Sequence, residues 1–232
     1  MSKIADNLNQ LEQQITEICQ SCGRAREEVE LIAVTKTRMA EEINEAIDWG
    51  VTQIGENKVQ EIMDKYEHVK PVRWHMIGHL QTNKVKYIVD KVFLIHSVDS
   101  FRLAEEIDKR AGEKGIQVPI LVQVNAAGEE SKFGVDVKET DALIDSIHQN
   151  CRNLIVEGLM TIAPYDPDPE QVRPYFRQMR QLFEKYRSRA DERMTFRHLS
   201  MGMSSDFPVA IEEGATMIRV GTAIFGERNY NQ

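Results

Sequence analysis

The run Glu30-Leu31-Ile32-Ala33-Val34-Thr35-Lys36 carries the strongest structural signal in the chain. Its apolar, β-branched residues predict a buried strand over residues 31–35, and a helical pattern over residues 39–49 follows at once. Lys36 therefore stands at the carboxyl end of a core strand, where parallel sheets and barrels hold their ligands. A partly desolvated ammonium there gives up its proton more readily, and the neutral amine can attack a carbonyl carbon. The alternative is a lysine that extends from the strand end into water.

Strand and helix patterns alternate from this run to the end of the chain. The predicted strands cover residues 31–35, 53–56, 73–77, 93–97, 119–124, 154–160, 196–200 and 217–220. The predicted helices cover residues 39–49, 57–67, 82–90, 100–114, 137–150, 168–190, 205–213 and 222–225. Eight strand–helix units predict an α/β fold of the (β/α)8, or TIM barrel, type. An open doubly wound sheet is the alternative, although the glycine fingerprint G-x-G-x-x-G does not follow the first strand.

An extra helix is predicted ahead of the first strand. Its apolar residues recur at spacings of four and three and form one stripe, made of Ile4, Leu8, Leu11, Ile15 and Ile18. Gly23 is expected to end this helix. The sequence contains no linker, composition break or low-complexity tract, so residues 1–232 are expected to form a single domain.

Composition narrows the class of protein. Hydrophobic residues make up 41% of the chain and charged residues 28%, which is typical of a globular protein. The net charge of −8 argues against a nucleic-acid partner, and no apolar run predicts a membrane span or a secretion signal. Cys19, Cys22 and Cys151 form an odd, sparse set that fits a reducing compartment, so a cytoplasmic location is expected. Cys19 and Cys22 have no second pair at zinc-finger spacing, and no metal site is predicted.

Two late strands end in small residues and hydroxyls that suit an anion. Residues 200–202 read Ser-Met-Gly and residues 219–222 read Arg-Val-Gly-Thr. Backbone N–H groups near Gly221, together with the hydroxyls of Ser200 and Thr222, could hold a phosphate, which barrels often bind at this place. The alternative is a pair of tight turns without a ligand.

Arg219 lies inside the last predicted strand. An arginine in a core strand is expected to be paired or to face a ligand, because an unpaired buried charge is costly. A pyridine nitrogen suits it, since a guanidinium donates a hydrogen bond without giving up its proton. An ion pair with Glu56 is the alternative. For Lys36, the two broad carbonyl partners are a sugar-type substrate and pyridoxal phosphate.

Several motifs are spaced along nearly the whole chain. They are residues 34–37 (VTKT), 55–57 (GEN), 74–78 (WHMIG), 80–84 (LQTNK), 158–160 (GLM), 199–204 (LSMGMS) and 218–226 (IRVGTAIFG). Together they resemble the pyridoxal phosphate homeostasis proteins, also called the YggS-like family. That family is similar to the barrel half of alanine racemase, a fold-type III pyridoxal phosphate protein.

The resemblance implies a set of cofactor-binding residues, which are Lys36, Asn57, Ser200, Arg219, Gly221 and Thr222. Lys36 would form the internal aldimine, Asn57 would lie beside the cofactor ring, and Arg219 would meet the pyridine nitrogen. The other three would hold the phosphate.

The chain also departs from the family pattern. Arg38 and His79 stand where relatives carry a lysine and a proline, so no role in cofactor transfer is carried over to Arg38. Lys132 does match a family lysine, and an accessory contact to the cofactor or its phosphate is a hypothesis for it. A solvated loop lysine is the alternative.

The resemblance implies a function. The chain would hold pyridoxal phosphate as a lysine aldimine and take part in intracellular vitamin B6 homeostasis, with little or no turnover. Racemisation needs a base on each face of the bound amino acid, and the sequence offers no obvious second base besides Lys36. An amino-acid racemase of alanine-racemase type and a cofactor-free Schiff-base aldolase remain the alternatives. A monomer is expected, with pyridoxal phosphate enzymes as possible recipients.

Overall fold

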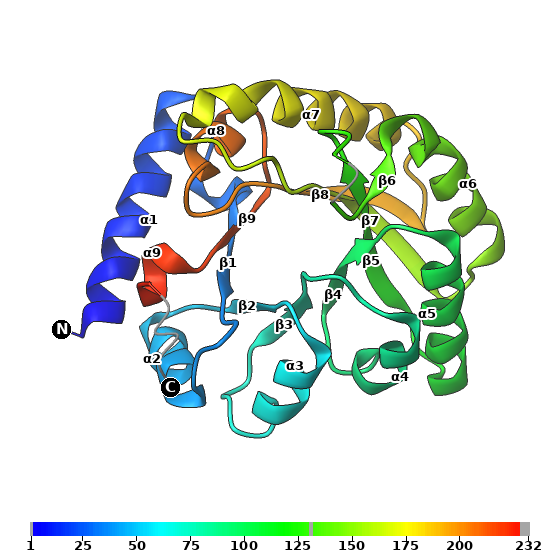
Figure 1. The fold of residues 1–232 in the computed structure, drawn as a ribbon, viewed down its shortest axis with the longest axis horizontal. Helices are drawn as coiled ribbons and strands as arrows, with labels where there is room; N and C mark the ends of the chain where they lie inside the picture. The colour runs from blue at the N-terminus through cyan, green and yellow to red at the C-terminus, as the bar shows by residue number, and fades with distance from the viewer. Residues whose placement is uncertain (1, 130–131, 228–232) are drawn as a thin grey trace.

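The computed structural model describes residues 2–129 and 132–227, and in this part of the chain parallel strands close into a barrel (Figure 1). The barrel strands are β1 (Glu30–Val34), β2 (Gln53–Glu56), β3 (Arg73–Met76), β4 (Leu94–Val98), β5 (Val118–Asn125), β7 (Leu154–Met160), β8 (Met194–Ser200) and β9 (Met217–Val220). Each pairs in parallel with the next, and β1 pairs with both β2 and β9. The predicted barrel is confirmed, and the open doubly wound sheet is wrong.

Helices surround the strands on the outside (Figure 1). They are α2 (Ala40–Trp49), α3 (Val59–Lys65), α4 (Val85–Ile88), α5 (Phe101–Lys114), α6 (Thr140–Asn150), α7 (Arg173–Arg187), α8 (Phe207–Glu212) and α9 (Thr222–Phe225). The predicted helix over residues 168–190 begins with a 3₁₀ turn, Pro169–Val172, before α7. In the described residues, no helix has the length and apolar character needed to cross a bilayer.

The expected extra helix is α1 (Lys3–Ser21). The Ser2 hydroxyl caps its first turn by accepting a hydrogen bond from the Ala5 N–H. Gly23 adopts a left-handed φ of 72° just beyond the helix, as its predicted role in ending the helix requires. The buried face of α1 packs against α2, α8 and α9, and so covers the outside of the seam where β1 meets β9.

One strand was not predicted. The segment over residues 125–136 contains a short strand, β6 (Val135–Asp136), which pairs with the end of β5 outside the barrel. Gly134 makes this pairing possible, because its φ is 123° and a Cβ atom there would lie 2.6 Å from the Asn125 nitrogen. Two residues are too few to give a strand periodicity in the sequence.

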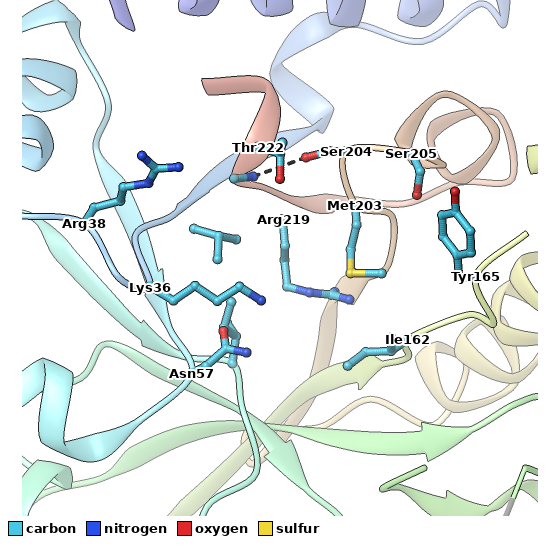
Figure 2. A pocket seen from close by; sticks show the side chains of 13 residues that line it. Lys36, Arg38, Asn57, Ile162, Tyr165, Met203, Ser204, Ser205, Arg219 and Thr222 are labelled. Atoms are coloured by element: carbon cyan, nitrogen blue, oxygen red, sulfur yellow. Dashed lines mark hydrogen bonds between the residues drawn. The ribbon is translucent and has the colours of Figure 1, made fainter. Parts of the chain in front are cut away.

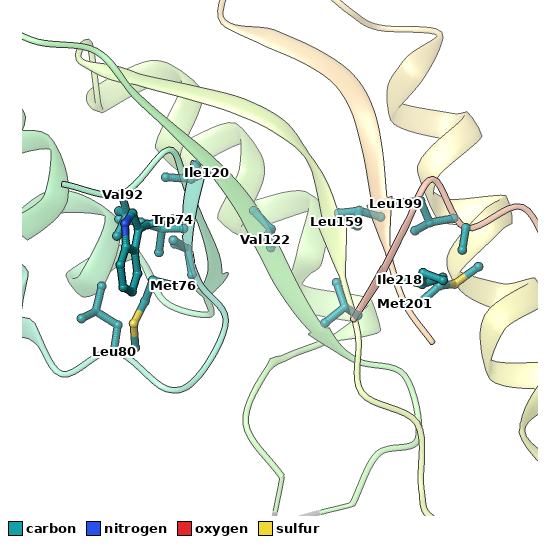
Figure 3. Packing of buried hydrophobic residues seen from close by; sticks show 14 of the residues in the cluster. Trp74, Met76, Leu80, Val92, Ile120, Val122, Leu159, Leu199, Met201 and Ile218 are labelled. Carbon is teal, nitrogen blue, oxygen red and sulfur yellow. The ribbon is translucent and has the colours of Figure 1, made fainter. Parts of the chain in front are cut away.

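The apolar side chains of β1, β4, β5, β7 and β9 divide between two hydrophobic clusters. On β5, Ile120 and Val122 belong to the large cluster between strands and helices (Figure 3), whereas Leu121 belongs to a small cluster inside the barrel. The other members of the inner cluster are Ile32, Leu94, Met160 and Met217. This alternation is expected for strands that are buried on both faces.

Leu11 tests whether α1 is an integral part of this structure. Leu11→Ala should lower the free energy of unfolding by about 2–5 kcal/mol, because the side chain is 2% exposed and its loss leaves a cavity. Urea unfolding followed by circular dichroism measures this. Gln10→Ala on the exposed face of the same helix is the matched control. Equal stability of the two variants would contradict the packing of α1 on the barrel.

Candidate functional site

The carboxyl ends of the barrel strands open into a cavity of about 580 Å³ (Figure 2). Its walls include Lys36 after β1, Asn57 after β2, Arg219 in β9 and Gly221 and Thr222 after β9. The structure thus brings together five of the six predicted site residues, from segments far apart in the sequence. Ser200 is the exception.

Lys36 enters the cavity from the end of β1. The preceding residue, Thr35, is fully buried and donates its N–H to the Gly55 carbonyl oxygen at 3.0 Å, which continues the pairing with β2. Lys36 itself is half-buried, and Figure 2 shows its side chain extending into the cavity toward the side where Arg219 lies. The residue is therefore partly removed from solvent.

Asn57 directly follows β2 and is held by close packing. A Cβ atom on Gly78, in the turn after β3, would lie 2.3 Å from the Asn57 carbonyl oxygen, so only glycine fits there. The Asn57 side-chain oxygen is buried and has no hydrogen-bond partner among the described residues. A polar group of a bound ligand would satisfy it.

Arg219 is 3% exposed and forms the inner wall of the cavity. Its guanidinium donates to the Ser200 hydroxyl at 2.6 Å and to the Thr161 carbonyl oxygen at 2.8 Å. Burial lowers the pKa of Arg219 to about 10, so the group stays charged at neutral pH. The alternative ion pair with Glu56 is not formed, because Glu56 accepts hydrogen bonds from Lys65 and Thr35 instead. The remaining N–H donors of the guanidinium can serve a ligand.

Ser200 lies behind Arg219 and not in the cavity wall. Its fully buried hydroxyl is 3.0 Å from His96 Nδ1, and His96 Nε2 is 2.9 Å from His75 Nδ1. Burial lowers the pKa of both imidazoles, that of His75 to about 3, so both are neutral at pH 7. Ser200 therefore links Arg219 to a buried hydrogen-bonded row that continues through His96 to His75.

The hydroxyls that do reach the cavity near Gly221 belong to Ser204, Ser205 and Thr222. The Gly221 N–H donates a hydrogen bond to the Ser204 Oγ, with 3.4 Å between nitrogen and oxygen (Figure 2). Asp206 fixes this turn by accepting a hydrogen bond from the Met203 N–H at 2.5 Å. Sequence reasoning missed Ser204 and Ser205, although both follow the predicted end of the seventh strand.

Three more residues singled out in the sequence, Lys132, Arg38 and His79, lie near the opening of the cavity. Lys132 donates to the Ala163 carbonyl oxygen at 3.2 Å and is paired with Glu129 at 3.3 Å, so it links two loops. Arg38 lies in the cavity wall, but its guanidinium donates to the Gly226 carbonyl oxygen. His79 stacks on Phe133, with ring centroids 4.0 Å apart.

The groups in this cavity match the parts of pyridoxal phosphate. An amine suits its aldehyde, a charged guanidinium suits its ring nitrogen, and a turn of hydroxyls beside a backbone N–H suits its phosphate. The buried Asn57 oxygen offers a further polar contact in the same wall. The residues present therefore fit the cofactor.

Comparison with known proteins gives the class. The family model described as "Alanine racemase, N-terminal domain" matches residues 7–229. Alanine racemase of Clostridium difficile, solved in complex with cycloserine, superposes with a TM-score of 0.74 at 13% identity, covering 100% of this chain and 61% of that chain. That likeness establishes the fold: a barrel of the alanine racemase N-terminal type.

More similar relatives define the particular group. A protein of Aquifex aeolicus named "Pyridoxal phosphate homeostasis protein" is 45% identical over 227 residues, which are 97% of this chain and 98% of the relative. PipY of Synechococcus elongatus, solved with pyridoxal phosphate bound, is 36% identical with a TM-score of 0.83 over 96% of this chain and 100% of that chain. The chain belongs to the pyridoxal phosphate homeostasis protein family, which confirms the resemblance drawn from the motifs.

The neutral state of His75 predicts how stability responds to acid. Its pKa falls from 6.5 in the unfolded chain to about 3, so the unfolded chain binds the proton first and stability is lost as pH falls through this range. His75→Gln cannot bind that proton. The difference in free energy of unfolding between wild type and this variant should therefore shrink by about 2 kcal/mol from pH 7 to pH 5.

Urea titrations at each pH measure this difference. The exposed His68→Gln, measured in the same way, is the matched control for the exchange of histidine for glutamine. A constant difference for His75→Gln would show that the folded protein protonates His75 as easily as the unfolded chain does.

Proposed function

We propose that the protein binds pyridoxal phosphate in this cavity and takes part in intracellular vitamin B6 homeostasis, with little or no turnover. One observation carries this proposal: the cavity combines the Lys36 amine, the buried Arg219 guanidinium and the hydroxyl turn at Ser204. The names of the relatives and the cofactor bound to PipY support it.

The inner half of the cavity holds the reactive end and the ring. The Lys36 amine would bond to the aldehyde carbon of the cofactor with loss of water. Arg219 would donate to the ring nitrogen and, because a guanidinium keeps its proton, would leave that nitrogen unprotonated. When bound, pyridoxal phosphate supplies an electron sink for bonds next to an amino group. A sink whose ring nitrogen faces arginine is weaker than one whose ring nitrogen is kept protonated by a carboxylate.

The outer half holds the phosphate. The Gly221 N–H and the hydroxyls of Ser204, Ser205 and Thr222 surround the space for it. A Cβ atom on Gly221 would lie 3.2 Å from Val34, so a larger residue would crowd the wall. For Ser200, the hydrogen bond to Arg219 favours a role in orienting the guanidinium over direct phosphate contact.

A second candidate function is an amino-acid racemase. One observation favours it: the Tyr165 phenol lies in the cavity wall across from Lys36 (Figure 2). Against it, Tyr165 is 83% exposed, and an exposed phenol is a poor base beside a wet site.

The proposal includes the cellular location, the oligomeric state and the partners of the protein. We place it in the cytoplasm, because Cys19, Cys22 and Cys151 are free thiols. It would act as a monomer formed by one domain over residues 1–232, with pyridoxal phosphate enzymes as recipients of the cofactor.

Lys36→Ala tests the proposed attachment. The variant should lose the yellow adduct and the borohydride-reduced peptide that contains residue 36, because no other lysine of the described residues lines this cavity. Its unfolding temperature should stay close to that of wild type, since the side chain is not part of the core. Absorbance with added pyridoxal phosphate, reduction and peptide mapping measure this. Lys58→Ala, an exposed lysine next to Asn57, should keep the adduct; a wild-type adduct that maps elsewhere overturns the assignment.

Solvent exchange separates the binder from the racemase. The loaded protein should not exchange the α-proton of amino acids with deuterated water, as followed by proton NMR over a broad amino-acid panel. Exchange that disappears in Tyr165→Phe would establish the racemase and refute the binder without turnover.

A further inference from the structure

The backbone next to Lys36 is strained. Thr37 has a φ of 63°, in the left-handed region. A β-branched residue rarely adopts this conformation, which persists only where the surrounding structure holds it. A left-handed residue directly after Lys36 changes the direction of the chain at the point where the lysine side chain leaves it.

Charged side chains outside the cavity hold this strained turn. The Thr37 N–H donates to Glu61 Oε2 at 2.7 Å. Lys65 Nζ donates to that same oxygen at 2.9 Å and to the Thr35 carbonyl oxygen at 3.0 Å. The two peptide groups that flank Lys36 are therefore bound by one ion pair on α3.

Glu56 at the end of β2 completes the arrangement. Its Oε1 accepts from Lys65 at 2.7 Å and from the Thr35 hydroxyl at 2.7 Å. We call Glu56, Glu61 and Lys65 the clamp. None of these three residues is part of the cavity wall in the described chain, so the clamp acts on a ligand through neighbouring residues, among them residues 35–37.

The side chains of the clamp are largely removed from water, which strengthens their hydrogen bonds. The side chain of Glu56 is fully buried, that of Lys65 is 13% exposed and that of Glu61 is 19% exposed. Burial alone would raise the pKa of Glu61, but hydrogen bonds from Lys65 and from the Thr37 N–H outweigh it and lower that pKa. Charge-assisted hydrogen bonds of this kind are stronger than neutral ones.

We infer that the clamp positions the Lys36 amine. By holding Thr37 in the left-handed conformation, it fixes the direction in which the lysine side chain enters the cavity. Glu56, Glu61 and Lys65 are therefore positioning residues that act through the backbone. The inference rests on the proposed function, because the orientation of the amine matters for its bond to the cofactor aldehyde.

The test combines removal of the clamp with relief of the strain. Glycine adopts a left-handed φ without the penalty that threonine has. The rate of covalent attachment is measured by rapid mixing of cofactor-free protein with pyridoxal phosphate, followed by absorbance. Glu61→Ala should slow attachment about tenfold or more. In the Thr37→Gly background, Glu61→Ala should change the rate by less than about threefold, because the strain that Glu61 opposes is gone.

Glu67→Ala, an exposed glutamate just beyond α3, is the matched control and should attach at the wild-type rate. Glu61→Gln keeps an acceptor of the same size and should give an intermediate rate even if Glu61→Ala folds poorly. In the cofactor-free protein, Glu61→Ala should also speed hydrogen exchange of the Thr37 amide, as measured by NMR.

The outcomes separate the two proposals. A wild-type protein with no adduct at Lys36 refutes the proposed function. An adduct that forms at the same rate in wild type and in Glu61→Ala leaves the function intact and refutes the clamp. If Glu61→Ala slows attachment equally with and without Thr37→Gly, Glu61 acts by charge alone, and the clamp is refuted in that case too.

Discussion

The pairing between β1 and β9 joins the two halves of the site. In its register, Ile32 lies opposite Arg219 and Ala33 opposite Val220. The Lys36 backbone therefore lies beyond the last residue of β1 that pairs with β9, nearer the mouth than Arg219, and its side chain reaches back into the cavity. Closure of the barrel thus sets the depth of the amine and of the guanidinium relative to each other. The cavity between them suits a small ring with one reactive end and one end that accepts a hydrogen bond.

Burial of the Arg219 charge shapes the barrel interior. A guanidinium removed from water needs hydrogen-bond acceptors, which Ser200 and the Thr161 carbonyl oxygen provide. Behind Ser200, the interior continues as two neutral imidazoles, those of His96 and His75, in place of apolar side chains. The outer core stabilises the barrel, whereas the polar side chains that lie inside it beside the small apolar cluster orient one functional group.

The sequence predicted the barrel because an apolar strand pattern followed by a helical pattern recurs from residues 31–35 to the last strand. It predicted Lys36 and Arg219 as site residues because a charged side chain in or at the end of a core strand is costly to bury unless it is paired or faces a ligand. It predicted Ser200 and missed Ser204, because the hydroxyl that reaches the cavity depends on where β8 ends and which way each side chain points. The clamp at Lys65 was equally hidden, because it requires the distance between α3 and the end of β1, which no local pattern encodes.

The position of α1 affects how the chain assembles. This helix precedes all the barrel strands in the chain, yet its Asn7 side chain donates a hydrogen bond to the Ile224 carbonyl oxygen, 217 positions away. During synthesis, its apolar stripe has to wait for α8 and α9 before it is covered. Contacts of such long sequence separation form slowly and leave apolar surface open meanwhile. Until α8 and α9 have left the ribosome, the nascent chain would therefore expose part of this apolar stripe to solvent.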